Sequence, residues 1–130
     1  MARDQAFSEA SARGTDRLIR WTKDGTLVCL TELVKAWGVD LEAIQAAVDR
    51  DDLFIIWIDD SPHVSAELLE LGAERSYEIC RSLGGQPATS KLIFLLRTHG
   101  CLAGKTVREA LRTGTPLERI RQLAQVSALY

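Results

Sequence analysis

Apolar and polar positions along most of this chain repeat at helical spacing. Between residues 31 and 38 leucine, valine and tryptophan recur every three or four positions, and a second such pattern runs from residue 40 to about residue 50. This spacing places apolar side chains on one face of a helix. Gly38 is typical of a helix C-terminus, and Asp40 of an N-cap. The pattern therefore predicts two short helices joined by a tight turn.

Two short runs predict strands. Residues 26–30 follow a turn dipeptide, and residues 54–58 form a continuous β-branched and aromatic run. A turn at residues 59–62 lets His63 and Val64 pair back, as the second arm of a small wing. We expect the strand at 54–58 to be covered on both faces, with the large indoles of Trp37 and Trp57 in the core.

The remaining apolar patterns are helical. A helix is expected to begin at the N-cap Ser65, and the sequence Gly-Gly-Gln-Pro at residues 84–87 is the clearest break in the chain. Ser90 is predicted to cap the next helix. Two stretches that combine threonine with glutamate three positions later, 106–109 and 115–118, have the form of capping boxes and mark the last two helices.

These elements predict a mainly α protein with a small β element. The organisation that we expect is a flexible N-terminal arm at residues 1–13, a winged-helix-like half at 14–84 and a C-terminal three-helix module at 88–130.

Composition limits the class of protein. The chain has 130 residues, of which 46% are hydrophobic and 26% charged, as in ordinary globular domains. No apolar run approaches the roughly 20 residues that a membrane-spanning helix needs, and the N-terminus lacks the apolar segment of a secretory signal. We therefore expect a cytoplasmic protein without membrane contact. The odd number of cysteines, Cys29, Cys80 and Cys101, predicts reduced thiols that serve as small packing residues.

Charge is divided unevenly along the chain. Residues 88–130 contain seven bases and two acids, a net charge of +5, while the remaining residues contain 9 bases and 16 acids, a net charge of −7. Lys105, Arg108 and Arg112 fall near one face of a predicted helix, so we expect them to contact DNA or an acidic partner. Two alternatives are that these bases form a solvated face, or that they meet the acidic half of a second copy.

The element order over residues 26–71 resembles the winged helix-turn-helix of the excisionase and MerR-like groups, and the resemblance implies that the second helix reads operator DNA in the major groove. The exposed positions of that helix would be Asp40, Glu42, Gln45 and Asp49. DNA binding depends on lysine and arginine to neutralise phosphates, whereas residues 31–79 carry 12 acids against three bases. We therefore expect these four residues to contact a protein partner.

The C-terminal stretch Leu102-Ala-Gly-Lys-Thr-Val-Arg-Glu-Ala-Leu-Arg-Thr-Gly114 resembles the toxin-binding domain of Xre, MbcA and ParS-type antitoxins. In that family a Leu-x-Gly-basic-Ser/Thr-Pro-x-Glu stretch ends in glycine before a last helix, and Val107 stands here at the proline position. The resemblance implies a helical module that forms a homodimer, binds a cognate toxin and represses its own operon.

The sequence offers no constellation for catalysis, a cofactor or a metal ion. His63 and His99 are the only imidazoles and lack metal-ligand spacing, and Gly84-Gly85 lacks the pattern of a phosphate-binding loop. We therefore predict an antitoxin-like or transcription-regulatory binding protein whose C-terminal module contacts a protein partner. The alternative is a protein adaptor or immunity-type partner that uses an acidic surface and does not bind DNA.

Overall fold

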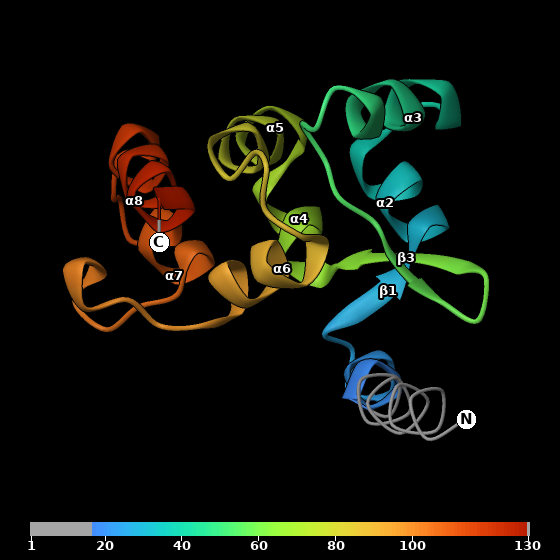
Figure 1. The fold of residues 1–130 in the computed structure, drawn as a ribbon, viewed down its shortest axis with the longest axis horizontal. Coiled ribbons are helices and arrows are strands. Elements are labelled where there is room, and N and C mark those ends of the chain that lie inside the picture. The colour runs from blue at the N-terminus through green and yellow to red at the C-terminus, as the bar shows by residue number, and fades with distance from the viewer. Residues whose placement is uncertain (1–16, 130) are drawn as a thin grey trace, which may run out of the picture.

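The computed structural model describes residues 17–129 and is mainly helical with one small sheet (Figure 1). The predicted arm at residues 1–13 lies outside the described residues. Residues 17–23 are helical and precede the sheet. The elements that follow are β1 (Leu27–Cys29), α2 (Leu30–Trp37), α3 (Leu41–Asp49), β2 (Ile56–Ile58), β3 (Ser61–Ser65), α4 (Ala66–Leu71), α5 (Ala73–Ser82), α6 (Ala88–Leu96), a 3-10 turn η1 (Gly100–Leu102), α7 (Val107–Arg112) and α8 (Leu117–Leu129). The predicted class, mainly α with a small β element, is confirmed.

The sheet is antiparallel, with β3 between β1 and β2. Val64 of β3 lies opposite Val28 of β1, and Pro62 lies opposite Trp57 of β2. Asp59 and Asp60 form the two-residue loop between β2 and β3, with φ angles of 49° and 64°. Positive φ at both positions gives the turn a twist that matches the strands of a hairpin. Strand, two helices and hairpin thus follow in the order expected for the N-terminal half.

The turn between α2 and α3 forms as the local sequence predicts. Gly38 adopts a left-handed conformation with φ 65°, and its N–H donates to the carbonyl of Val34. The Asp40 carboxylate accepts a hydrogen bond of 2.8 Å from the Ala43 N–H and caps α3. Both groups satisfy backbone atoms that the helix ends would leave without partners.

The prediction that both tryptophans are core residues is wrong for Trp57, whose side chain is 62% exposed. Ile56 and Ile58 on either side are buried, because successive side chains of a strand point to opposite faces. Trp37 is half-buried, packs edge-to-face on Tyr77 at 5.5 Å between ring centroids, and donates from Nε1 to the carbonyl of Leu68 at 3.0 Å.

The break at residues 84–87 separates α5 from α6, but the predicted cap at Ser90 is wrong. The helix begins at Ala88, and the extended residue before it is Pro87, whose carbonyl accepts from the Lys91 N–H at 3.2 Å. Proline has no N–H to lose at a helix start, so the helix begins three residues earlier than a cap at Ser90 implies. The cap at Thr106 is confirmed, because its hydroxyl oxygen accepts from the Glu109 N–H.

One cluster of buried apolar residues extends through both halves, from Leu27 of β1 to Ala124 of α8. Figure 1 shows α5 between the sheet-containing half and α8, and α5 contacts α8 directly. The α4 helix contacts α7 in the same way. The C-terminal helices are therefore held against the rest of the protein. No helix within residues 17–129 has the length and apolar character that crossing a bilayer requires.

Candidate functional site

Histidine and cysteine side chains do not converge in the described part of the chain. His63 Nδ1 lies 3.0 Å from the Ser61 carbonyl and His99 Nε2 lies 2.9 Å from the Phe94 carbonyl, so both buried imidazoles hydrogen-bond to backbone nearby. Within residues 17–129 no three His, Cys, Asp or Glu side chains come together as a metal site would require. These imidazoles therefore serve local structure.

The cysteines differ in their surroundings. Cys80 is fully buried, and this burial raises the pKa of its thiol to about 12. The prediction that Cys29 and Cys101 are packing residues is wrong, because both are exposed. Cys29 lies at the end of the edge strand β1, and Cys101 lies in the short turn η1 beside α8.

The outer face of α3 carries the residues that we predicted to contact a protein partner. Glu42, Gln45 and Asp49 are exposed, and Gln45 Nε2 donates to Asp49 Oδ1 at 3.1 Å. Asp40 is also exposed, but its carboxylate is the N-cap of the helix. Beside them Leu41 is 61% exposed. The structure therefore adds an apolar residue to this acidic face, which the prediction from the sequence did not include.

The predicted basic contact residues are not free. Arg112 forms an ion pair with Glu70 through Nη2 and Nε, the latter at 3.0 Å. Arg108 Nε lies 3.0 Å from Glu67 Oε2 and 3.4 Å from Glu70 Oε2, without the angle of a hydrogen bond. Lys105 Nζ donates to the Thr113 hydroxyl at 2.9 Å. We call the two arginines and two glutamates of α4 and α7 the α4–α7 clasp.

The two carboxylates of the clasp titrate in opposite directions. Burial raises the pKa of Glu67 above its usual range, and the nearby Arg108 only partly offsets this effect. The hydrogen bond from Arg112 lowers the pKa of the exposed Glu70. The positive charge that the sequence assigned to an external polyanion is therefore largely neutralised within the chain.

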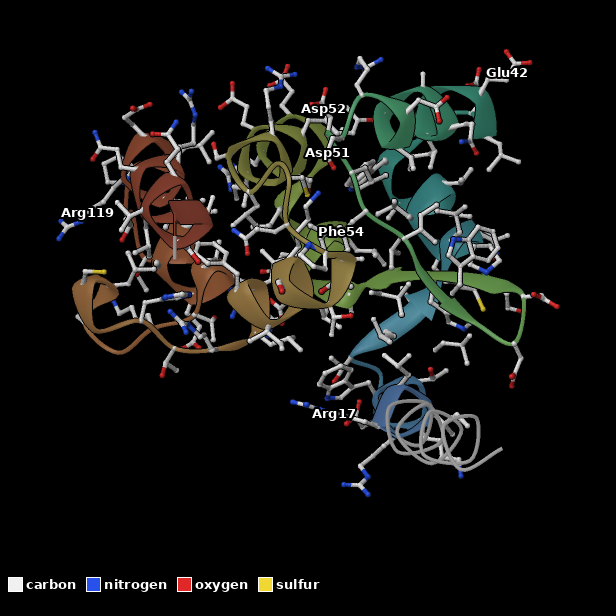
Figure 2. All side chains as sticks on the ribbon, viewed as in Figure 1. Arg17, Glu42, Asp51, Asp52, Phe54 and Arg119 are labelled. Carbon is white, nitrogen blue, oxygen red and sulfur yellow. The ribbon has the colours of Figure 1, made fainter. Side chains whose placement is uncertain are left out.

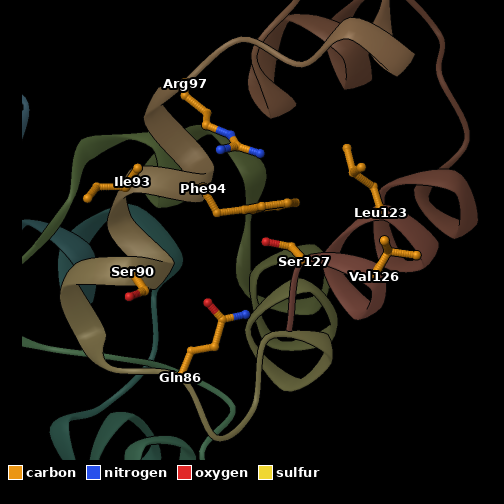
Figure 3. A pocket seen from close by; sticks show the side chains of 8 residues that line it. All are labelled: Gln86, Ser90, Ile93, Phe94, Arg97, Leu123, Val126 and Ser127. Atoms are coloured by element: carbon orange, nitrogen blue, oxygen red, sulfur yellow. The ribbon is translucent and has the colours of Figure 1, made fainter. Parts of the chain in front are cut away.

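A groove lies between α6 and α8, and we call it the α6–α8 groove. Its larger hollow, of about 420 Å³, lies between α6 and α8, and a second hollow of about 310 Å³ lies between η1 and α8. Leu123 and Val126 line both. Figure 3 shows the larger hollow, where Phe94 and Arg97 point from α6 towards α8. Ile93 and Val126 are 37% and 52% exposed, although both side chains are apolar. The groove is thus an apolar surface that the described chain leaves open.

All charged side chains that line the groove are positive. Arg97 lines the larger hollow and Arg119 the smaller one, and no carboxylate among the described residues lines either. Arg119 Nη2 donates to the carbonyl of Cys101 at 3.2 Å, whereas Arg97 has no ion-pair partner within residues 17–129. Gln86 Nε2 is buried at the edge of the groove without a hydrogen-bond partner among those residues. A ligand with acceptor oxygens would satisfy these donors.

The structure also shows an ion-pair cluster that was not predicted from the sequence. Lys91 Nζ lies 2.5 Å from Asp51 Oδ1, and Asp52 accepts from Arg81 and from Arg50. Figure 2 shows Asp51 and Asp52 beside α5. The neighbouring acids at 51 and 52 were the available signal, because carboxylates just after a helix C-terminus oppose the helix dipole unless bases compensate them.

Comparison of the chain with models of protein families, with curated proteins and with solved structures found no match. Arguments about function therefore depend on the geometry of the α3 face, the α4–α7 clasp and the α6–α8 groove.

Proposed function

We propose that this chain is an antitoxin-like or transcription-regulatory binding protein whose C-terminal module holds a protein partner in the α6–α8 groove. The observation that carries the proposal is the pair of hollows on either side of Leu123 and Val126, with the apolar side chains of Ile93 and Val126 exposed at their edges. Apolar centres with polar rims are typical of protein interfaces.

The groove is a better candidate for this contact than the bases chosen from the sequence. Arg108 and Arg112 are already paired with Glu67 and Glu70, so a partner that used them would have to break those pairs first. Arg97 of the groove has no ion-pair partner among the described residues, so a partner could bind it without breaking an existing pair. An incoming carboxylate or carbonyl would therefore gain a charged hydrogen bond at little cost.

Co-expression of this chain with the product of the neighbouring reading frame tests the proposal. We expect the two proteins to purify together, and Val126→Asp to abolish the complex, because the new carboxylate removes an apolar contact and competes with the partner for the arginines of the groove. Gln125→Asp is the matched control, since it adds the same charge to an adjacent exposed position of α8. A complex that survives Val126→Asp would contradict the proposed role of the groove.

DNA binding by the N-terminal half is a second candidate, favoured by the order β1, α2, α3, β2 and β3. The exposed side chains of α3 oppose it, because Glu42 and Asp49 would face phosphates. An electrophoretic shift assay with the upstream intergenic DNA separates the candidates. Retardation that weakens with salt would favour DNA binding, whereas an adaptor gives no retardation.

A further inference from the structure

Two exposed surfaces of this one chain are complementary. The α6–α8 groove is apolar, contains Arg97 and Arg119, and has no carboxylate among its described lining residues. The outer face of α3 offers the opposite combination, an exposed Leu41 next to Glu42 and other acidic residues. The first surface lacks acids and the second lacks bases.

The side chains on α3 are arranged to act together. Successive residues of an α-helix are about 100° apart, so Leu41, Glu42, Gln45 and Asp49 all lie within an arc of about 100°. The buried residues Ile44 and Ala47 lie on the other side of the helix, and Ala43 lies away from the acidic arc. A single helix face therefore presents an apolar side chain together with two carboxylates.

We propose that α3 of one copy docks into the α6–α8 groove of a second copy. Leu41 enters the groove beside Val126, and the carboxylates of Glu42 and Asp49 face the two arginines. Complementary charges set the orientation of such a contact, and the buried apolar side chains supply most of its stability. The inference rests on the proposed function, because it takes the groove to be a binding surface. In the free protein a second copy occupies that surface, so a foreign partner competes with self-association.

The contact is head-to-tail. Glu42 and Arg119 point outward at opposite ends of the molecule, so a copy cannot insert its own α3 into its own groove (Figure 2). Repetition of a head-to-tail contact gives a ring or an open chain. A symmetric contact between two grooves would instead bring Arg97 and Arg119 of both copies together, and like charges would oppose it.

Sedimentation of the full chain over a wide dilution series tests the contact. We expect the mean mass to rise above the 14.4 kDa of one copy as concentration increases, and to fall again at high salt. Leu41→Lys and Val126→Asp should each sediment as single copies. The matched controls Ala43→Lys and Gln125→Asp add the same charges outside the two surfaces and should associate as the unchanged chain does. Circular dichroism establishes that each variant is folded.

Mixing the two variants gives a sharper test. Leu41→Lys retains an intact groove and Val126→Asp retains an intact α3, so an equimolar mixture should associate at least to a dimer of twice 14.4 kDa. An unchanged chain that is monomeric at all concentrations, folded single variants that still associate, or a mixture that stays monomeric would each overturn the proposal.

The two proposals fail separately. Leu41→Lys leaves the groove open, so this variant should still purify with the neighbouring gene product. If the complex forms but self-association is absent, only the head-to-tail contact is wrong. If self-association depends on both surfaces but no foreign partner binds Leu41→Lys, the proposed function is wrong and the head-to-tail contact stands.

Discussion

Lys91 and Asp51 are joined by an ion pair of 2.5 Å that ties α6 to the segment after α3. The Lys91 side chain is 2% exposed, whereas that of Asp51 is 52% exposed. The other carboxylate oxygen of Asp51 accepts from the Gly85 N–H at 3.0 Å. One aspartate thus fixes both α6 and the turn that leads into it, and its loss would leave a buried ammonium group without this partner.

Asp51→Asn is predicted to destabilise the fold by about 1–3 kcal/mol, since the buried Lys91 side chain loses its charged partner, although Asp51 itself is half-exposed. Asparagine tolerates the left-handed backbone of residue 51, where φ is 62°. The decrease in the free energy of unfolding therefore comes from the lost charge and not from backbone strain. Denaturant unfolding measures the change.

Lys91→Met serves as the control for this prediction. Methionine keeps an apolar chain in the buried site, and the exposed Asp51 can be solvated, so we expect a smaller loss of stability than in Asp51→Asn. Asp51→Asn should cost little further in a protein that already carries Lys91→Met. Equal losses in the two single variants would contradict the explanation by an unpaired charge.

Acid should unfold the protein through the same cluster. The hydrogen bonds from Arg81 and Arg50 hold the pKa of Asp52 below its usual range against the effect of burial. Burial raises the pKa of Asp51, but the hydrogen bonds from Lys91 and Gly85 outweigh this effect and leave it lowered. Groups with a lowered folded-state pKa contribute stability above their unfolded-state pKa and lose it as the pH falls through the folded-state value.

The melting temperature should therefore vary little near neutral pH and fall once the pH drops below the ordinary range of aspartate. Calorimetry over a series of pH values measures this dependence. The Asp52→Asn variant should have a lower melting temperature at neutral pH, and its melting temperature should fall less steeply as the pH decreases. An unchanged decline would mean that other carboxylates control acid unfolding.

The helix pair α2 and α3 could be predicted from the sequence because its signals are local. Gly38 ends one helix, Asp40 caps the next, and both act within four residues along the chain. The exposure of Trp57 was missed because a continuous apolar run hides the alternation of a strand, and only the neighbouring elements decide which face is covered.

The candidate site was harder to predict, because its charges are paired over long sequence separations. Arg112 pairs with Glu70, 42 residues earlier, and Lys91 pairs with Asp51, 40 residues earlier. Counting charges along the chain cannot reveal such pairs. The open groove was missed for a related reason, since helical spacing marks the apolar positions of α8 but not those that remain uncovered, such as Val126.

Thiol labelling should distinguish the three cysteines. Cys29 and Cys101 are exposed and should react rapidly with a thiol reagent in the native protein. Cys80 should react only on unfolding, because burial raises its pKa to about 12 and removes the reactive thiolate. Mass spectrometry of the labelled native protein should locate the rapid modifications. Rapid labelling of Cys80 would contradict its burial.

Trp37→Phe and Trp57→Phe form a matched pair of substitutions. Trp37→Phe removes the hydrogen bond to Leu68 and is expected to cost about 1 kcal/mol or more. Trp57→Phe changes an exposed side chain and should stay within about 0.5 kcal/mol of the unchanged protein. Urea unfolding followed by circular dichroism measures both. A larger loss for Trp57→Phe would indicate that this residue is covered, for example by another copy.

The contact between α5 and α8 limits how the last three helices can be exchanged in evolution or in the laboratory. Ile79 and Leu83 belong to the same buried cluster as Ile120 and Ala124, on the far side of the turn at residues 84–87. A chimaera spliced at that turn keeps the α5 side of this contact and takes the α8 side from another protein. It should fold well only if the incoming helices supply side chains of matching volume for α5. Substitutions in the groove are therefore tolerated more readily than substitutions in the α5–α8 contact.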